Sequence, residues 1–126
     1  MKNAVVYFEI QATDPKNLAS FYQQLFGWTF IKEENLPIEY YRIETAGIMG
    51  GLLKRPEEVP PSNCGTNAFT CSMEVDDFDQ TSANILHNGG KIALPKFAVI
   101  GKCYQEYFTD PDNNIFGIFE VDINAH

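Results

Sequence analysis

The residues best suited to chemistry lie on the polar faces of two short strands, which the sequence predicts half a chain apart. Polar and apolar residues alternate in both strands, and the polar sets are Tyr7, Glu9 and Gln11 in the first and Thr70, Ser72 and Glu74 in the second. Successive side chains of a strand point to opposite faces of a sheet. Each set is therefore predicted to project from one face, where it can line a ligand site.

Glu9 is the best candidate in this group for a general base, with Tyr7 as its acid/base partner. Ten Phe, six Tyr and one Trp give the chain enough aromatic surface to wall a cavity, and a carboxylate in such a cavity can have a raised pKa. The alternative is that Glu9 is a solvated or hydrogen-bonded strand residue, as a carboxylate without a geometric partner usually is. The same two interpretations apply to Glu74.

Glycines interrupt two predicted strands, the Gly50-Gly51 pair within residues 48–54 and Gly117 within residues 115–121. Glycine weakens the interior of a strand and often marks a bend or the close approach of another group. Either these glycines let the sheet bend or they leave room for a bound ligand, and both interpretations stay open. Gly50 and Gly117 are therefore included in the candidate ligand-binding set.

The cysteines and histidines form no recognisable disulfide or metal pattern. Cys64, Cys71 and Cys103 are odd in number and contain no CxxC pair, so neither a disulfide framework nor a structural zinc site is expected. His87 falls on a predicted helix and His126 falls in the tail. Free thiols are typical of a reducing compartment, and a cytoplasmic location is expected.

The charge balance of this 126-residue chain excludes several classes of partner. It has 17 acidic and 9 basic residues, for a formal net charge of −8. It has no cluster of Lys and Arg of the kind that neutralises nucleic-acid phosphates or an anionic membrane surface. It also has no apolar run long enough for a secretion signal or a membrane span. Nucleic-acid and membrane partners are therefore not expected.

The first half of the chain predicts one strand, one helix and three further strands. Residues 4–12 alternate as a strand. Asp14 and Pro15 then begin a helix, which Gly27 can end in the left-handed conformation. The apolar stripe of this helix consists of Leu18, Phe21, Tyr22, Leu25 and Phe26. The further strands cover residues 28–32, 38–45 and 48–54.

The second half repeats this plan after a proline-rich linker over residues 55–65. Asp77, with Gln80 three residues later, resembles a capping box at the start of a helix. Strands are predicted over residues 67–75, 91–97, 103–109 and 115–121. The strand at 91–97 is expected to break at Pro95 and to be followed by a loop over residues 98–102. The segment DPDNN predicts a hairpin turn, and the tail at 122–126 is expected to fray.

Several segments together resemble the vicinal-oxygen-chelate superfamily, also called the glyoxalase/bleomycin-resistance/dioxygenase family. They are FEI…TDPKNLASFYQQLFGW, GGLLKRP, MEVDDFDQ, NGGKI and YFTDPDNNIFGIFE, which follow the family's order over nearly the whole chain. The resemblance implies a small glyoxalase-like member with an α+β fold. Two βαβββ modules, at about residues 1–55 and 66–122, would form a single domain over residues 1–126. Its mixed sheet would curl into a cup, with the helices outside and the ligand inside.

The metal-dependent members of this superfamily draw His, Gln or Glu ligands from four strands. The resemblance places these positions at Tyr7, Gly50, Thr70 and Gly117. None of the four is a competent ligand for a borderline divalent metal, although a tyrosine can contribute to an iron site. No bound metal and no other cofactor are therefore expected.

Two classes of function remain open, and the sequence does not decide whether the chain is an enzyme. The first is a glyoxalase/bleomycin-resistance-like protein that binds a small organic molecule in the cup, where acidic residues would favour a cationic ligand. The second is a lyase, isomerase or hydrolase of the same superfamily that uses Glu9 as acid/base, or a metal enzyme with atypical ligands. The resemblance also implies a homodimer. The sequence identifies neither the ligand nor whether the modules pair within one chain or between two.

Overall fold

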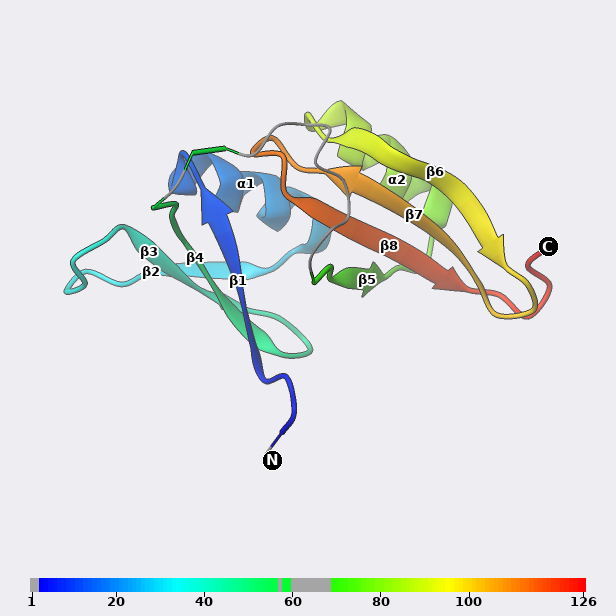
Figure 1. Cartoon of the computed structure of the whole chain (residues 1–126), viewed down its shortest axis with the longest axis horizontal. Coiled ribbons are helices and arrows are strands. Elements are labelled where there is room, and N and C mark those ends of the chain that lie inside the picture. Colours follow the sequence, from blue (N-terminus) through cyan, green and yellow to red (C-terminus); the bar gives the residue numbers. More distant parts are fainter. Residues whose placement is uncertain (1–2, 57, 60–68) are drawn as a thin grey trace. The chain divides into compact units, whose positions relative to one another are not determined.

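The chain divides into two compact units, unit 1 (residues 1–59) and unit 2 (residues 60–126). The computed structural model describes residues 3–56, 58–59 and 69–126, so much of the predicted linker and Cys64 lie outside the described residues. In these described residues, each unit has one helix and one four-stranded sheet (Figure 1). Within the described ranges, neither helix has the length and apolar character needed to cross a membrane.

Unit 1 forms a mixed sheet of four strands with one helix. Its elements are β1 (Tyr7–Ala12), α1 (Pro15–Phe26), β2 (Thr29–Lys32), β3 (Tyr40–Glu44) and β4 (Met49–Lys54). The strands lie in the order β1-β4-β3-β2. β1 and β4 run parallel, and the other neighbours are antiparallel. The predicted order of elements is confirmed.

Unit 2 repeats this plan. Its elements are β5 (Ser72–Glu74), α2 (Phe78–His87), β6 (Lys91–Val99), β7 (Cys103–Thr109) and β8 (Ile115–Val121). The strands lie in the order β5-β8-β7-β6, and β5 runs parallel to β8 as β1 does to β4. Two mixed sheets with one helix each confirm the predicted α+β class and the repeated βαβββ unit.

Both helices begin with the caps that the sequence predicts. Asp14 accepts a hydrogen bond from the backbone N–H of Asn17 at 3.2 Å, and Asp77 accepts one from the backbone N–H of Gln80 at 3.1 Å. These carboxylates satisfy amides that have no partner inside the helix. α1 ends at Gly27, whose φ of 69° is in the left-handed region that favours glycine.

An aromatic cluster joins α1 to one face of the unit 1 sheet. The rings of Phe8 on β1 and Tyr22 on α1 both pack against Trp28, with centroid separations of 5.7 and 5.6 Å. Tyr22 is buried, and so are Ile43 and Leu52 of the sheet. Because side chains alternate along a strand, the neighbours of Phe8 on β1 lie on the opposite, open face.

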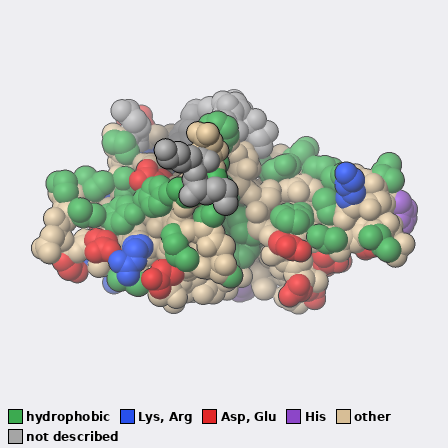
Figure 2. All heavy atoms as spheres, turned by 90° about the horizontal axis from the view of Figure 1, so that it is seen from below, with side chains coloured by type: hydrophobic (Ala, Val, Ile, Leu, Met, Phe, Trp, Pro, Cys, Tyr) green, Lys and Arg blue, Asp and Glu red, His purple; other side chains and the backbone are tan. Residues whose placement is uncertain are grey.

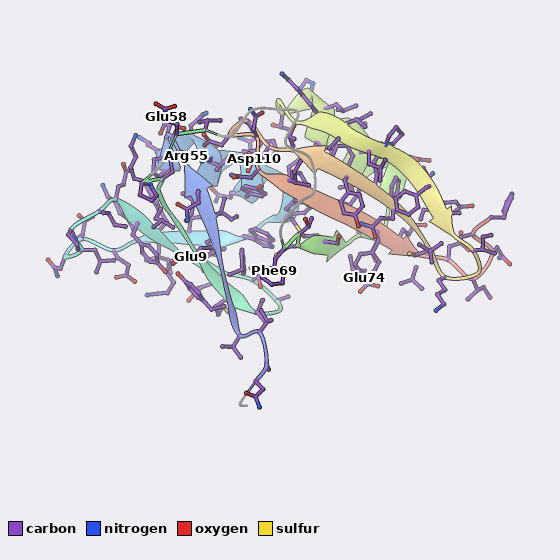
Figure 3. All side chains as sticks on the ribbon, viewed as in Figure 1. Glu9, Arg55, Glu58, Phe69, Glu74 and Asp110 are labelled. Carbon is purple, nitrogen blue, oxygen red and sulfur yellow. The ribbon has the colours of Figure 1, made fainter. Side chains whose placement is uncertain are left out.

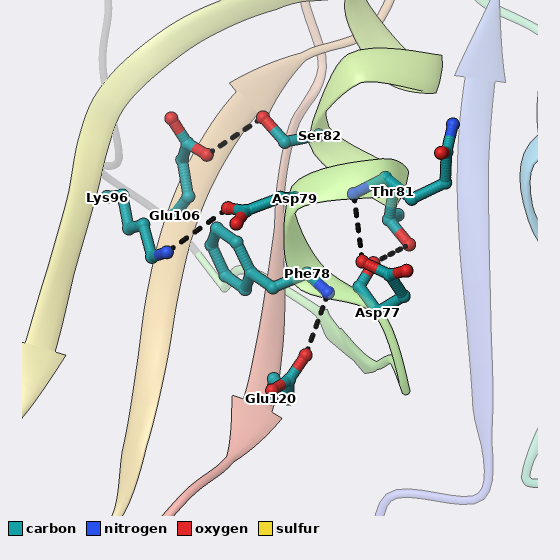
Figure 4. A network of polar contacts seen from close by, with 9 residues as sticks. Asp77, Phe78, Asp79, Thr81, Ser82, Lys96, Glu106 and Glu120 are labelled. Carbon is teal, nitrogen blue, oxygen red and sulfur yellow. Dashed lines mark hydrogen bonds and ion pairs between the residues drawn. The ribbon is translucent and has the colours of Figure 1, made fainter. Parts of the chain in front are cut away.

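Polar contacts hold α2 against the unit 2 sheet (Figure 4). Glu120 of β8 accepts a hydrogen bond from the backbone N–H of Phe78, the first helical residue, at 2.8 Å. Ser82 of α2 donates to the buried Glu106 of β7 at 3.1 Å. The helix therefore covers the face that carries Glu106 and Glu120. The residues that alternate with them along β7 and β8 lie on the opposite, open face.

Strand β6 is longer than the sequence predicts. It continues through Pro95 for nine residues, where a break was expected, and the predicted loop at 98–102 is correspondingly shorter. β6 is the edge strand of its sheet, and its pairing with β7 shifts register near Pro95. An edge position and a bulge are where a strand tolerates a residue without a backbone N–H.

The C-terminal tail is ordered, so the prediction that it frays is wrong. The backbone N–H of Gly101 donates to the carbonyl of Ala125 at 2.9 Å. Ala125 is only 3% exposed. The tail packs against the turn between β6 and β7. The sequence of the tail alone does not predict these tertiary contacts.

Asp110 organises the turn between β7 and β8. Its side chain is buried, and it accepts hydrogen bonds from the backbone N–H of Asp112 at 2.8 Å and of Asn114 at 3.0 Å. The side-chain amide of Asn114 also donates to it at 3.0 Å. Asn113 takes a φ of 60°, which Asn tolerates better than most residues. The predicted hairpin turn is confirmed.

Replacing Asp110 with alanine is expected to destabilise the protein. The change leaves backbone donors in a buried turn without their acceptor, so the free energy of unfolding should fall by roughly 2–3 kcal/mol. Urea denaturation followed by far-ultraviolet circular dichroism measures this. Asp76→Ala is the matched control, because Asp76 is exposed, and it should change stability by less than about 0.5 kcal/mol. Equal losses in the two variants would contradict the role of Asp110.

Candidate ligand-binding site

Two tyrosines and one glutamate form a cluster on the open face of the unit 1 sheet. The hydroxyl of Tyr7 donates to Oε2 of Glu9 at 3.0 Å. The hydroxyls of Tyr7 and Tyr40 are 2.7 Å apart. Glu9 projects from β1 in Figure 3, and both it and Tyr7 are exposed. The structure thus brings the predicted pair of Tyr7 and Glu9 into contact and adds Tyr40. We call these three residues the tyrosine–glutamate cluster.

Gly51 of β4 lies beneath this cluster. It pairs with Glu9 of β1 and with Arg42 of β3, so it occupies the strand between them. A Cβ atom placed on Gly51 would overlap the hydroxyls of both Tyr7 and Tyr40. Strands β1 and β3 are second neighbours, about 10 Å apart. The missing side chain of Gly51 is therefore what allows the two hydroxyls to meet across the central strand.

The surroundings of Tyr7 keep its phenol protonated. Burial raises the pKa of Tyr7, and the hydrogen bonds to Tyr40 and Glu9 raise it further, with the negative charge of Glu9 acting in the same direction. Although the Tyr7 side chain is partly exposed, its hydroxyl lies over Gly51 against Tyr40 and Glu9, so a phenolate there would lose solvation and would be repelled by the carboxylate. Tyr7 is therefore suited to donating a hydrogen bond rather than to acting as a base or a nucleophile.

A salt-bridge network occupies the next part of the open face. Nη1 of Arg42 lies 2.6 Å from Glu33, and its Nη2 lies 3.7 Å from Glu44. Two carboxylates therefore compensate the charge of Arg42. At the far end of β1, Gln11 is half-buried, and its backbone carbonyl accepts a hydrogen bond from Nη2 of Arg55 at 3.3 Å.

A second polar pair lies over Gly117 on the unit 2 sheet. The side-chain amide of Gln105 on β7 donates to Oγ of Ser72 on β5 at 2.9 Å. A Cβ atom placed on Gly117 would lie 2.5 Å from Ser72 Oγ and 2.6 Å from Gln105 Nε2. Gly117 pairs with Ser72 in the parallel ladder, as Gly51 pairs with Glu9. The two units thus share one local arrangement, a polar pair bridging over a glycine in the central strand.

Gly50 does not lie on the open face, contrary to the prediction. It pairs with Phe8, and a Cβ atom placed on it would lie 2.6 Å from the Phe8 ring, on the face that α1 covers. A one-residue shift moves a side chain to the other face of a sheet, and the adjacent glycines make such a shift hard to detect by sequence matching. Gly51 is the counterpart of Gly117.

Thr70 and Glu74 are less closely tied to the polar pair of unit 2. Strand β5 contains only three residues, so Thr70 precedes it and is half-buried outside the regular ladder. Glu74 ends β5 and is exposed (Figure 3). In the part of the chain that the structure describes, no side chain forms a hydrogen bond with Glu74.

Exposed apolar side chains accompany the polar pair of unit 2. Leu94 and Phe97 of β6 pair with Tyr107 and Gln105 of β7, and Val99 follows on the same face. All three β6 side chains are exposed, and the Phe97 ring stacks on Tyr107 with centroids 6.3 Å apart. Figure 2 shows hydrophobic side chains gathered at the surface among polar ones. Apolar surface with a few convergent polar groups is typical of small-molecule sites.

Sequence reasoning missed Tyr40, Gly51 and Gln105. Tyr40 and Gln105 lie on strands that were predicted, but their partners are two strands away in the sheet. Alternation predicts which face a side chain occupies and not which strands become neighbours. The pair of glycines in IMGGLLK was the one available signal for Gly51, and it pointed equally to Gly50.

The donor set at the family's metal positions does not fit a divalent metal. With Gly51 in place of Gly50, the positions that the resemblance assigns to metal ligands hold Tyr7, Gly51, Thr70 and Gly117. The two glycines have no side-chain donor. Tyr7 and Thr70 supply only hydroxyls, and metal sites of this type use imidazole, carboxylate or amide groups. No group of three or more His, Cys, Asp or Glu suited to a metal occurs within residues 3–56, 58–59 and 69–126.

Comparison with known proteins identifies the family. Residues 4–118 match the family model of the Glyoxalase/Bleomycin resistance protein/Dioxygenase superfamily. The chain belongs to this superfamily. A glyoxylase-like domain-containing protein from Didymella fabae is 34% identical over 89 residues, which make up 66% of this chain and 66% of that relative.

Solved structures of this superfamily share the fold. A glyoxalase/bleomycin resistance protein/dioxygenase family enzyme from Burkholderia phytofirmans PsJN matches with a TM-score of 0.75 and 21% identity, over 93% of this chain and 98% of that one. The fosfomycin resistance protein FosX from Listeria monocytogenes matches with a TM-score of 0.75 and 16% identity, over 94% and 91% of the two chains. At these identities the likeness establishes the fold of this chain.

Gly51→Ala is expected to separate the hydroxyls of Tyr7 and Tyr40. The overlapping atoms are the ends of long side chains, which move more easily than backbone, so the cost should be about 1 kcal/mol, the worth of one hydrogen bond. The pKa of Tyr7 should fall toward its ordinary value because a hydrogen bond that raises it is lost. A spectrophotometric titration of tyrosine absorbance, with Tyr7→Phe as the reference that lacks this phenol, measures the change.

Gly47→Ala is the control for this variant, because a Cβ atom at Gly47 would meet only the Thr45 hydroxyl at 3.9 Å. The pKa of Tyr7 is raised in the folded chain above the ordinary 10.0. Its contribution to stability is therefore present below pH 10 and lost as the pH rises above that value. Gly51→Ala should reduce the stability that is lost at alkaline pH. An unchanged titration of Tyr7 in Gly51→Ala would contradict the contact between Tyr7 and Tyr40 over Gly51.

Proposed function

We propose that this protein is a glyoxalase/bleomycin-resistance-like protein that binds a small organic molecule on the open faces of its sheets, without a bound metal. The observation that carries the proposal is the polar pair that each unit places over a glycine on the face its helix leaves open. In unit 2 these polar groups adjoin exposed aromatic and aliphatic side chains. Such a face offers both apolar contact and hydrogen bonds that orient a ligand.

The metal-free part of the proposal rests on Gly51 and Gly117. A metal-coordinating side chain at either glycine position would have to occupy space that the neighbouring polar pair fills. The hydroxyls of Tyr7 and Tyr40 fill it in unit 1, and the side chains of Ser72 and Gln105 fill it in unit 2. The donor chemistry and the packing at these positions therefore support the same proposal.

Native mass spectrometry and elemental analysis of the purified chain test the proposal together. We expect a small organic molecule to be retained or to be bound from a screened collection, and less than stoichiometric Ni, Zn, Fe and Mn. We also propose a cytoplasmic homodimer, and the same spectra should show twice the mass of one chain. A stoichiometric, tightly held transition metal would overturn the metal-free proposal. Failure of every organic molecule to bind would overturn the binding function.

A second candidate function is a lyase, isomerase or hydrolase that uses Glu9 as acid/base. The observation that favours it is the hydrogen bond of 3.0 Å from the Tyr7 hydroxyl to Glu9. This bond orients the carboxylate on an exposed face and leaves one of its oxygens available for a substrate proton. Tyr7 would then hold the carboxylate in place rather than exchange a proton itself.

Glu9→Gln tests this second function once a reaction is identified. Loss of the base should lower kcat by at least about a hundredfold, the usual contribution of general acid–base catalysis. Glu34→Gln makes the same change of charge on an exposed turn of unit 1 and should leave kcat unchanged. Turnover that survives in Glu9→Gln would remove Glu9 from the mechanism.

A further inference from the structure

We propose that the tyrosine–glutamate cluster of unit 1 is a binding site for a protonated amine. This inference rests on the proposed function, because it names the chemical class of ligand for one of the open faces. It follows from the direction of the hydrogen bonds among Tyr7, Glu9 and Tyr40, from the charges beside them and from their accessibility.

With Glu9 ionised, the two contacts of Tyr7 can both be hydrogen bonds in only one arrangement. A phenol has a single proton, and Tyr7 donates its proton to Oε2 of Glu9. In its contact of 2.7 Å with Tyr40, Tyr7 must therefore accept, and Tyr40 must donate. Both phenolic protons are thereby used inside the cluster. The atoms left for a ligand are acceptors, namely the second carboxylate oxygen of Glu9 and the remaining lone pairs of the two phenols.

A protonated amine is the complement of such a site. An ammonium group carries three donors, no acceptor and a positive charge. A carboxylate or a phosphonate carries acceptors and negative charge, so it would meet unpaired acceptors and repulsion from Glu9. The aromatic faces of Tyr7 and Tyr40 are a further attraction for a cation, which favours the negative face of a ring.

The charges on the same face reinforce this preference. Arg42 lies across Gly51 from Glu9, and Glu33 and Glu44 already engage it. Glu9, Glu33 and Glu44 supply three carboxylates around the one guanidinium of Arg42, so the charges beside the cluster sum to a negative value. Arg42 therefore does not offer a competing site for an anion.

The cluster is accessible to a ligand. Tyr7 is 44% exposed, and Glu9 is exposed beside it. Within the described part of the chain, the only side chain that bonds to Glu9 is that of Tyr7. An ammonium can therefore reach the carboxylate without breaking an existing salt bridge.

Isothermal titration calorimetry of the full chain with three matched probes tests the proposal. Phenethylamine, hydrocinnamate and phenethyl alcohol share an aromatic ring and a two-carbon arm, and they end in an ammonium, a carboxylate and a hydroxyl. We expect phenethylamine to bind at least about tenfold more tightly than the other two, as the loss of one charge-assisted hydrogen bond implies. Glu9→Gln should abolish this preference.

Tyr40→Phe and Glu34→Gln complete the design. Removing the Tyr40 hydroxyl takes away one acceptor and should weaken amine binding severalfold while leaving the preference for the amine. Glu34→Gln changes the net charge equally on an exposed turn and should leave amine affinity unchanged. Circular dichroism of each variant confirms that it is folded before its affinity is compared.

Three results would overturn the inference. Hydrocinnamate binding as tightly as phenethylamine would overturn it and leave the proposed function in place, and so would undiminished amine binding by Glu9→Gln. If none of the three probes binds, the inference fails alone when native mass spectrometry finds another organic occupant. It fails together with the proposed function when no occupant is found.

Discussion

Each four-stranded sheet packs its helix against one face, and this arrangement governs both units of the chain. α1 covers the face of Phe8 and Ile43, and α2 covers the face of Glu106 and Ile118. Because strand side chains alternate, every residue between these core positions must lie on the open face. The candidate site is therefore built by the same alternation that builds the two cores, and the chain needs no separate element to carry it.

Glycines in the central strands give the open faces their local chemistry. A side chain at Gly51 or Gly117 would displace the polar side chains that reach over it from the strands on either side. Without that side chain, polar groups meet over the strand, as Tyr7 meets Tyr40 in unit 1 and the Ser72–Gln105 pair forms in unit 2. The two units therefore carry the same local arrangement on the faces that their helices do not cover.

Much of the fold was predictable because its signals are local. The caps at Asp14 and Asp77 act on amides only a few residues away, and the DPDNN turn is closed by its own side chains. The errors concern features that depend on distant partners. β6 passes through Pro95 because it lies at a sheet edge, and the tail is ordered because Ala125 packs against a turn far from it in sequence.

The sequence by itself determined that Tyr7, Glu9 and Ser72 share faces away from their helices, because alternation along a strand is a property of the backbone. It also supplied the residue types at the positions that the resemblance assigns to metal ligands, and the absence of a bound metal stays a prediction. Only the tertiary structure decided that Tyr40 joins Tyr7 and that Gly51, not Gly50, lies beneath them. Strand order and register place those residues together, and the residue pattern of a single strand predicts neither of them.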